Sequence, residues 1–323
     1  MRLRVLFALV ALLTAALGTP AQAQEYPARP IRMVVPFGPG TSTDIAGRIF
    51  AQGLGQQLKQ TIVVENKPGA GGNIGTEAVA RAARDGYTLS FGTVGTFAIN
   101  ASIYRKLPFD PQRDFNPLAL AGATPTLLAV RTDAPYSSVA DLVTYAKRHP
   151  DKVSFASAGN GTSGHLAGEL LKTMSGAPMT HVPYKEGVQG LTAVISGQVD
   201  FMFYHPAAVM PQITSGRLKA LAASGARRSA AASNVPTLAE SGFPGFDLVA
   251  WFMLAAPAGT PAPIVNRLLE ASDRVLKTPE IVRQLEAQGI EQLPIPASGL
   301  PAFLARENAK WGKVVQASGA QVD

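Results

Sequence analysis

Three glycine-rich turns constrain the fold of this chain most strongly, because each joins a short apolar run to a helical pattern. The first joins the apolar run Ile31–Val35 to Asp44–Leu58, whose apolar residues recur at helical spacing. The others are Asn66–Asn73 and Ser157–Thr162, again between a predicted strand and a predicted helix. Strand, turn and helix in this order predict parallel α/β sheets with free N–H groups at the helix starts, where an anion can bind.

Two long apolar runs predict how the chain is divided into lobes. Leu118–Val130 and Leu248–Ala256 are each expected to cross from one α/β lobe to the other. The predicted lobes are residues 24–122 with 248–323, and residues 123–247, with hinges near 121–126 and 246–251. Each lobe is expected to hold a mainly parallel sheet flanked by helices. Because open α/β sheets bind ligands beyond the carboxyl ends of their strands, the glycine-rich turns should face an interlobe cleft.

The first 23 residues have the pattern of a cleaved export signal. Met1–Arg4 is basic, Val5–Leu17 is apolar except for Thr14, and Ala21-Gln22-Ala23 is a small-x-small cleavage site. The apolar run is short for a membrane span. A buried N-terminal helix is the alternative. The signal predicts a mature protein in the periplasm.

Composition excludes several classes of function. The chain has no cysteine, which excludes thiolate catalysis and cysteine metal sites. Its formal charge is +7, and loss of Arg2 and Arg4 with the signal leaves a modest positive excess that suits an anionic small ligand. No dense run of Lys and Arg interleaved with aromatic residues is present, so nucleic acid is not an expected partner.

The polar residues do not form a recognisable catalytic or metal motif. Gly161–His165 misses the Gly-x-Ser-x-Gly nucleophile elbow by one position. The histidines, His149, His165, His181 and His205, lack metal-ligand spacing. We therefore expect no catalytic residue, metal or cofactor, and interpret His181 and His205 as structural. An exported α/β hydrolase or transferase remains the alternative.

Several single residues permit two interpretations. His165, one turn into its helix, could touch a ligand or hydrogen-bond the preceding loop. Asp44 is most simply a cap or first-turn acid. Asp200 could pair with a ligand amine or fix a loop, and Trp251 is expected in the core rather than as a ligand platform.

Several motifs together closely resemble the Bug-type, TctC-like receptors of tripartite tricarboxylate transporters, and the resemblance covers the whole mature chain. Those motifs are Tyr26-Pro27-x-x-Pro30-Ile31-Arg32, Val34–Phe37, Val64–Asn73, Ser157-x-Gly159-x-Gly161-Thr162-x-x-His165, His181–Tyr184, Gly197-x-Val199-Asp200, Trp251 and Ala256–Pro261. The resemblance implies a two-lobed periplasmic binding protein fold of type II kind that closes on a carboxylated solute. It also implies that Phe37–Thr43 and Ser157–Thr162 hold the carboxylate through backbone N–H groups, hydroxyls and water.

The chain departs from the family pattern at three places. Thr41 stands where the family usually has glycine, Ala101 where it has proline, and Glu186 interrupts a Tyr-Lys/Arg-Gly motif. The expected ligand-binding residues are Phe37, Gly38, Gly40, Thr41, Ser42, Asp44, Thr93, Gly95, Ser157, Gly159, Asn160, Gly161, Thr162, His165, Tyr184 and Asp200. The expected ligand is a dicarboxylate, an amino acid or an aromatic acid. The expected partner is a set of membrane transporter subunits or a sensor protein, between which the sequence does not decide.

Overall fold

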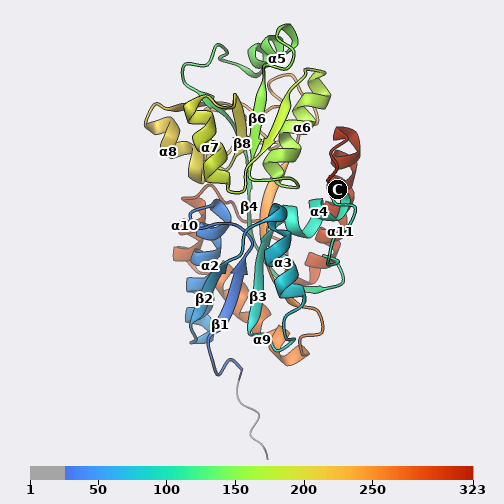
Figure 1. Ribbon diagram of the computed structural model, residues 1–323. Helices are drawn as coiled ribbons and strands as arrows, with labels where there is room; N and C mark the ends of the chain where they lie inside the picture. The colour runs from blue at the N-terminus through green and yellow to red at the C-terminus, as the bar shows by residue number, and fades with distance from the viewer. Residues whose placement is uncertain (1–25, 323) are drawn as a thin grey trace, which may run out of the picture.

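Two α/β lobes are stacked along the long axis of the molecule, each built on a sheet of its own (Figure 1). The computed structural model describes residues 26–322. The predicted export signal, residues 1–23, lies outside the described residues. The arrangement confirms the predicted two-lobed α/β fold, while the residue-level lobe boundaries stay a prediction.

Lobe 1 is the lower lobe in Figure 1 and contains the first sheet. Its strands, in spatial order, are β2 (Ile62–Asn66), β1 (Ile31–Val35), β3 (Thr88–Thr93), β10 (Val249–Pro257) and β4 (Phe115–Pro125). Its helical segments are α2 (Ser42–Leu58), η1 (Ala70–Gly72), α3 (Asn73–Ala80), η2 (Gly95–Ile99), α4 (Asn100–Ile103), α9 (Ala262–Leu276) and α10 (Pro279–Glu286). Strand β1 is parallel to β2 and β3, whereas β10 is antiparallel to both of its neighbours.

Lobe 2 repeats this plan with the second sheet. Its strands, in spatial order, are β7 (Thr180–Pro183), β6 (Ser154–Ser157), β8 (Phe201–Tyr204), β5 (Leu127–Arg131) and β9 (Leu218–Ala223). Its helical segments are α5 (Val139–Arg148), α6 (Ser163–Ser175), α7 (Gly187–Ser196), α8 (Pro206–Thr214) and η3 (Ala230–Ala232). Here β5 is the strand that runs against its neighbours, while β6 is parallel to β7 and β8.

The prediction of mainly parallel sheets is confirmed in strand direction, with one reversed strand in each sheet. The reversed strands are β10 and β5. Each leads the chain into a lobe from the boundary between the two lobes, called the waist below, and therefore runs away from the cleft. The other strands end at the waist, which brings their following loops together there. Those loops carry the predicted site.

Two local features differ from the sequence prediction. Beyond β3 the chain continues into the π-helical turn η2 and then α4, where no helix was predicted from the sequence. Every residue of η2 is buried, so the segment has no polar face and lacks the amphipathic period that identifies a helix. The long run Leu118–Val130 is interrupted at Thr126, which separates β4 from β5.

A hydrogen-bonded clasp holds the crossing segments together at the waist. The Ser224 hydroxyl accepts from the Thr126 N–H at 2.9 Å and donates to the Leu248 carbonyl at 2.6 Å. The backbone of Ser224 also donates to Thr126 O at 2.9 Å and accepts from Leu248 N–H at 2.8 Å. Thr126 and Ser224 are both buried. The clasp lies within or beside the predicted hinges and ties both crossings to one residue.

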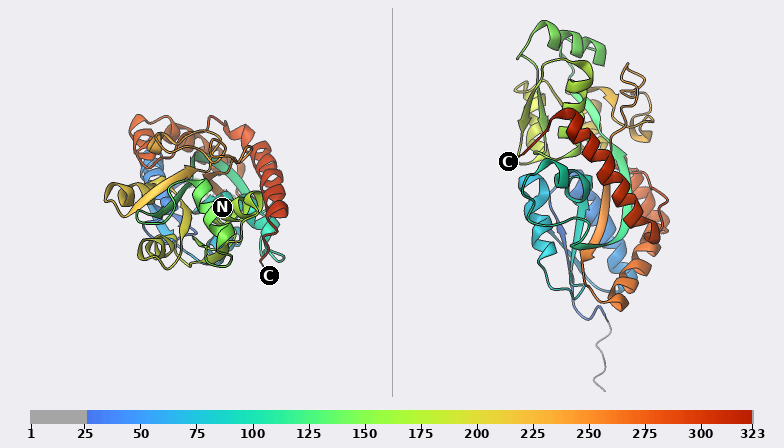
Figure 2. Two further views of the ribbon diagram at one scale, coloured as in Figure 1. Left: turned by 90° about the horizontal axis from the view of Figure 1, so that it is seen from above. Right: turned by 90° about the vertical axis from the view of Figure 1, so that its right-hand side faces the viewer.

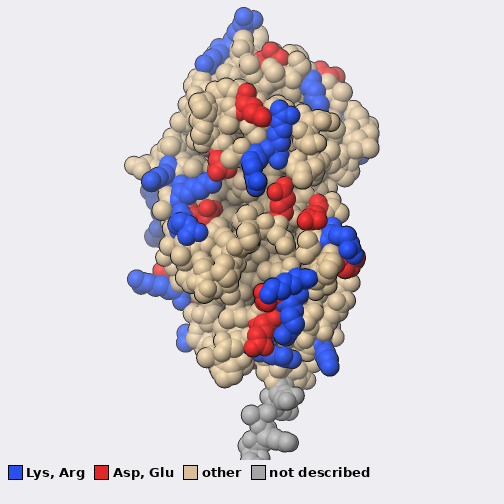
Figure 3. All heavy atoms as spheres, turned by 180° about the vertical axis from the view of Figure 1, so that it is seen from behind, with Lys and Arg blue, Asp and Glu red and all other residues tan. Residues whose placement is uncertain are grey.

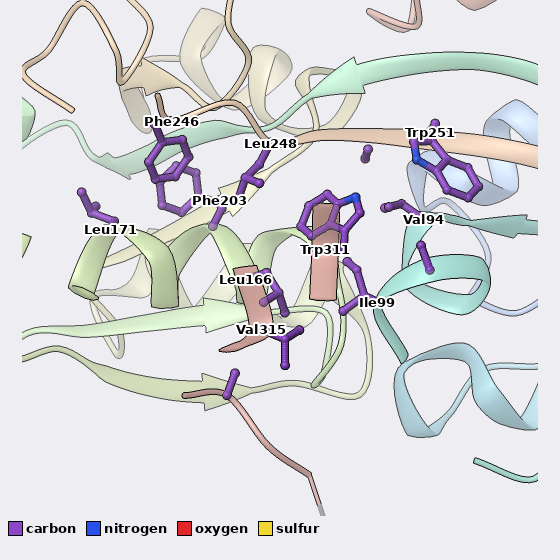
Figure 4. Close-up of a cluster of buried hydrophobic side chains, with 14 of the residues drawn as sticks. Val94, Ile99, Leu166, Leu171, Phe203, Phe246, Leu248, Trp251, Trp311 and Val315 are labelled. Atoms are coloured by element: carbon purple, nitrogen blue, oxygen red, sulfur yellow. The ribbon is translucent and has the colours of Figure 1, made fainter. Parts of the chain in front are cut away.

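The C-terminal helix α11 (Leu300–Ser318), preceded by the short turn η4 (Ala297–Gly299), packs on both lobes. It contacts η2 and α4 of lobe 1 and α6 of lobe 2, and the side view in Figure 2 shows it lying diagonally across the waist. Figure 4 shows Trp311 and Val315 of α11 among Val94 and Ile99 of lobe 1 and Leu166 of lobe 2. The lobes therefore share one apolar core on this side.

Trp251 belongs to the same core, as the sequence predicted. Its indole N–H donates to Glu307 Oε2 at 2.7 Å, and the indole N–H of Trp311 donates to the same oxygen at 3.0 Å. One carboxylate of α11 thus accepts hydrogen bonds from both buried indole N–H groups. A buried tryptophan usually needs such a partner for its N–H.

Charged side chains of both signs are distributed over the surface of both lobes (Figure 3). On the face shown in Figure 3, basic and acidic side chains are interspersed over both lobes and no broad basic patch is seen. Among residues 26–322, no helix combines the length and apolar character needed to cross a membrane.

Candidate functional site

A cavity lies between the lobes, where the glycine-rich loops of both sheets meet. Its lining comes from both lobes: Phe37, Thr41, Ser42, Thr43, Thr93, Ala158, Thr162, Ser163, Gly164, Phe203, Tyr204, His205, Ala250 and Phe252. The space open to the centres of water-sized groups is about 40 Å³. Because one water needs roughly 10–15 Å³ by this measure, the cavity has room for a few polar atoms.

The N-terminus of α2 forms the lobe 1 side of the cavity. Thr41 is its N-cap, and the Thr41 hydroxyl donates to Gly38 O at 2.8 Å and accepts from the Asp44 N–H at 3.3 Å. The Asp44 carboxylate reaches back to accept from the Gly40 N–H at 3.0 Å. Gly40 has a φ of +75°, which a residue with a Cβ adopts only with strain.

The N-terminus of α6 forms the lobe 2 side with nearly the same geometry. The Thr162 hydroxyl donates to Gly159 O at 2.8 Å and accepts from the His165 N–H at 3.4 Å. The Gly161 N–H donates to His165 Nδ1 at 3.2 Å, and Gly161 has a φ of +78°. Both loops read Gly-x-Gly-Thr-Ser, at residues 38–42 and 159–163.

The two helix starts give the cavity a positive potential without any Lys or Arg in its lining. Each helix N-terminus carries unpaired N–H groups and a partial charge of about +0.5. Because the two starts come from opposite lobes and border one cavity, their potentials add there. The arrangement suits one carboxylate held between the lobes.

Two side chains in the lining have buried polar atoms without a partner in the described part of the chain. Ser42 Oγ and His205 Nδ1 are both buried, and neither makes a hydrogen bond among residues 26–322. The Tyr204 hydroxyl, beside them in the lining, makes none in the described chain either. Burial lowers the pKa of His205 to about 4, so its imidazole is neutral near pH 7. Since buried polar groups are normally paired, these atoms are hydrogen-bonding groups left available in the cavity.

A stacked pair of histidines packs behind the loop that precedes α6. The rings of His165 and His181 lie 4.0 Å apart between centroids, and His181 Nε2 is 2.7 Å from Ser157 Oγ. Burial, with a smaller contribution from the Lys172 charge, lowers the pKa of His165 to about 4. Burial, His165 and Lys172 lower the pKa of His181 to about 3. Both rings are therefore neutral near pH 7, which leaves His165 Nδ1 free to accept from Gly161.

The glycine-rich loop of lobe 2 contacts lobe 1 directly. The Tyr104 hydroxyl of lobe 1 donates to Asn160 O of lobe 2 at 3.5 Å. Gly71 lies against the Asn160 carbonyl, and Gly161 lies against the Asn100 side chain, so that neither glycine has room for a Cβ. These approaches describe a closed arrangement of the two lobes.

The structure brings part of the predicted site together in the cavity. Phe37, Thr41, Ser42, Thr93 and Thr162 line it. A second group shapes the loops behind the lining: Gly38, Gly40, Asp44, Ser157, Gly159 and His165. For His165 this is the loop-bonding role, one of the two interpretations drawn from the sequence.

The remaining predicted residues lie outside the lining. Gly95, Asn160 and Gly161 lie where the lobes touch. Tyr184 follows β7, and its N–H donates to Ser157 O at 3.0 Å. The prediction that Asp200 binds the ligand is wrong. Its carboxylate accepts from the Ser154 N–H at 2.8 Å, at the end of the sheet away from the cleft. It fixes the starts of β6 and β8 and cannot meet a ligand amine in this cavity.

Sequence reasoning missed the lining contributed by β8 and β10. Phe203, Tyr204 and His205 come from the carboxyl end of β8, and Ala250 and Phe252 from the returning strand β10. One signal was available for His205, because it directly follows a strand and precedes Pro206 at a helix start. The repeated Gly-x-Gly-Thr-Ser sequence was a second unused signal, because it indicates that the loops before α2 and α6 have equivalent positions in the two lobes.

Among the described residues, no group of three or more His, Asp or Glu side chains is arranged to hold a metal ion. Asp44, in the first turn of α2, already accepts hydrogen bonds from Arg48 Nε at 2.9 Å and from Asn66 Nδ2 at 2.9 Å. Burial opposes its ionisation, but these bonds and the Gly40 N–H outweigh burial and hold the pKa of Asp44 below its usual value.

Comparison with known proteins places this geometry in a family. The sequence profile described as "Tripartite tricarboxylate transporter family receptor", TctC, matches residues 46–320. The structure of the periplasmic binding protein BugD superposes with a TM-score of 0.87 at 35% identity, covering 92% of this chain and 99% of BugD.

Two similar structures were solved with carboxylates. The Rpa4515 protein of R. palustris with adipate has a TM-score of 0.88 and 35% identity, covering 92% of this chain and 100% of the other. MatC from Rhodopseudomonas palustris with bound malate has a TM-score of 0.84 and 34% identity, covering 90% and 100%.

Proposed function

The chain belongs to the tripartite tricarboxylate transporter receptor family, TctC, and from this premise we propose that it captures a small organic carboxylate between its lobes for uptake across the membrane. It is a Bug-type periplasmic solute-binding protein, and its family and structural neighbours are binding proteins rather than enzymes. The carboxylate ligand of this chain, the residues that hold it and the coupling to transport are the proposal.

The pairing of the two Gly-x-Gly-Thr-Ser helix starts across one cavity is the observation that carries the proposal. In this proposal, the ligand carboxylate accepts hydrogen bonds from the free N–H groups of α2 and α6 and from the Ser42 and Ser163 hydroxyls. Hydrogen bonds to a charged acceptor contribute about 1.5–3 kcal/mol each, so a few of them suffice for tight binding without an arginine.

The lining beyond the helix starts suggests a short ligand. Phe37, Phe203 and Phe252 supply apolar walls, and the Tyr204 hydroxyl and His205 imidazole supply single hydrogen-bonding groups. Adipate and malate, which the two similar structures contain, are four- to six-carbon acids of this general kind. We therefore expect a compact aliphatic acid to bind better than a large aromatic one.

Delivery to a membrane transporter completes the proposal. Transporter subunits are the partners that the family implies, and the basic, apolar and small-x-small pattern of residues 1–23 supports export with cleavage after Ala23. Mass spectrometry of the protein from its native envelope should give a chain that begins at Gln24. A mature chain that retains Met1 would contradict the export proposal.

A thermal-shift screen of aliphatic dicarboxylates, amino acids and aromatic acids tests ligand class directly. A ligand that binds only the folded chain at a hundred times its Kd stabilises it by about 2.7 kcal/mol, which raises the melting temperature by a few degrees. A compact acid should produce this shift, and calorimetry should then give its Kd. The proposal fails if no carboxylate stabilises the protein and uncharged solutes do.

A further inference from the structure

Glu186 places an acidic side chain at the boundary between the lobes, close to the cavity. It is the N-cap residue of α7, but its carboxylate does not cap that helix. The side chain instead turns toward lobe 1, where the carboxylate lies against Gly38. Only a glycine leaves room for it, because a Cβ at position 38 would occupy the position of the carboxylate.

The Glu186 carboxylate has no compensating partner. It accepts no hydrogen bond and forms no ion pair within residues 26–322. Other acids near the loops are paired: Asp44 with Arg48, Glu65 with Lys67, and Glu169 with Lys172. Glu186 is half-buried, so part of its charge is removed from water and left uncompensated.

Two neighbours connect Glu186 to the cavity. Gly38 directly follows Phe37, which lines the cavity, and Gly187 lies against the hydroxyl of Tyr204, another lining residue. Burial and then the negative charge of Glu186 raise the pKa of Tyr204. The carboxylate therefore acts electrostatically on a group that faces the ligand space, at the rim formed by the two lobes.

We propose that Glu186 is a charge selector, which favours carboxylate ligands whose other end carries an ammonium group and disfavours those with a second carboxylate. This inference rests on the proposed function, because the first carboxylate is the one held by α2 and α6. An ammonium group at the far end would give Glu186 the partner that it lacks. A second carboxylate at that end would be repelled by the unpaired, negatively charged Glu186.

The physical argument sets the size of the effect. Unit charges within several ångströms at a partly buried protein site interact by more than thermal energy, whereas at an open surface they interact weakly. Because Glu186 is half-buried, we expect its charge to change the preference between matched ligands by about tenfold. Glu186 of lobe 2 lies against Gly38 of lobe 1 in this closed arrangement, so the proposed selection applies to the closed, ligand-holding form.

The experiment uses pairs of ligands with the same spacer. Succinate and 3-aminopropanoate share two methylene groups, and adipate and 5-aminopentanoate share four. Calorimetry of the mature protein at pH 7 gives Kd for each, and the observable is the ratio of Kd values within a pair. Glu186→Gln removes the charge and keeps the shape, and Lys185→Gln removes an adjacent exposed charge as the matched control.

In the unmodified protein the amino acid of at least one pair should bind more tightly than its dicarboxylate. Glu186→Gln should shift the ratio about tenfold toward the dicarboxylate, and Lys185→Gln should leave it within about twofold. Equal changes for both members of a pair would show that Glu186 only affects closure and would overturn the selector. If neither member binds in any variant, the proposed function fails instead, and the two failures are thereby distinguished.

Discussion

The starts of α2 and α6 have nearly the same backbone, yet different side chains hold them. In both, a threonine caps the helix and the third helical residue accepts from the second glycine of the loop. In lobe 1 that residue is the ionised Asp44, bound by Arg48 and Asn66. In lobe 2 it is the neutral His165, stacked on His181.

The comparison shows that the helix start needs an acceptor at the third position and not a particular charge. A carboxylate supported by Arg48 and an imidazole kept neutral by burial both serve. The ligand is therefore expected to meet similar N–H groups on its two sides, while the supports behind them respond differently to acid. Substitutions at equivalent positions can separate the two halves.

Acid should affect the lobe 2 support first and most strongly. The folded pKa of His165 is lowered to about 4, so the unfolded chain binds a proton near pH 6.5 that the folded chain refuses. Stability should therefore fall as pH drops from about 6.5 toward 4, by roughly 3 kcal/mol for His165 alone. Asp44 has a lowered pKa, so its contribution is lost only below the usual range of an aspartate.

Denaturant unfolding between pH 7 and 4.5 measures this effect. His165→Asn, which retains an acceptor, should make stability less dependent on pH in this window. Asp44→Asn should leave the pH dependence as it is. If both substitutions reduced the pH dependence of stability equally, the proposed difference between Asp44 and His165 would be wrong.

The second glycine of each loop gives the next largest contrast. Gly161→Ala adds strain at positive φ and also drives a Cβ into the Asn100 side chain of the other lobe. Gly40→Ala adds the strain alone, because nothing lies within 4 Å of its added Cβ. We expect a loss of affinity of about a hundredfold for Gly161→Ala and about tenfold for Gly40→Ala. Calorimetry with the acid found by the thermal-shift screen checks this, and equal losses would contradict the closed contact.

The capping threonines should give smaller and matched effects. Thr41→Ala and Thr162→Ala each remove a cap and a loop hydrogen bond, which costs about 1 kcal/mol of folding stability. Each should also weaken ligand binding several-fold by loosening the loop. Urea unfolding and calorimetry on the two single variants would show this. A loss confined to one of them would show that only one helix start matters.

Lys67 should matter least. It follows β2 and pairs with Glu65 at 3.2 Å at a partly exposed site, where an ion pair contributes about 0–1 kcal/mol. Lys67→Ala should therefore change ligand affinity by less than about threefold. A loss as large as that of Gly161→Ala would mean that a cation rather than the helix starts holds the carboxylate.

Much of the fold was predictable because strand, glycine-rich turn and helix recur with clear local signals. The missed segment was η2 and α4. All residues of η2 are buried and α4 has only four residues, so neither shows a helical period that could be detected. The reversed directions of β5 and β10 follow from the two crossings between lobes, because each of these strands leads the chain from the other lobe into its own sheet.

The site was predictable where residues follow strands within a glycine-rich loop. Phe37, Thr41, Ser42 and Thr162 were found in this way and line the cavity. Phe252 was missed because it joins the cavity only through the pairing of β10 with β3. Asp200 was misplaced although it precedes β8 and so lies at the amino end of that strand, away from the cleft, where its carboxylate accepts from the Ser154 N–H.

The most direct measurement of the central claim compares a bound acid with its own primary amide by calorimetry on the mature protein. The two ligands share a shape, and only the acid carries the charge that the starts of α2 and α6 are proposed to hold. Loss of charge-assisted hydrogen bonds should weaken the amide by about tenfold to a hundredfold. If the amide bound as tightly as the acid, the paired helix starts would be tight connections and not an anion clamp.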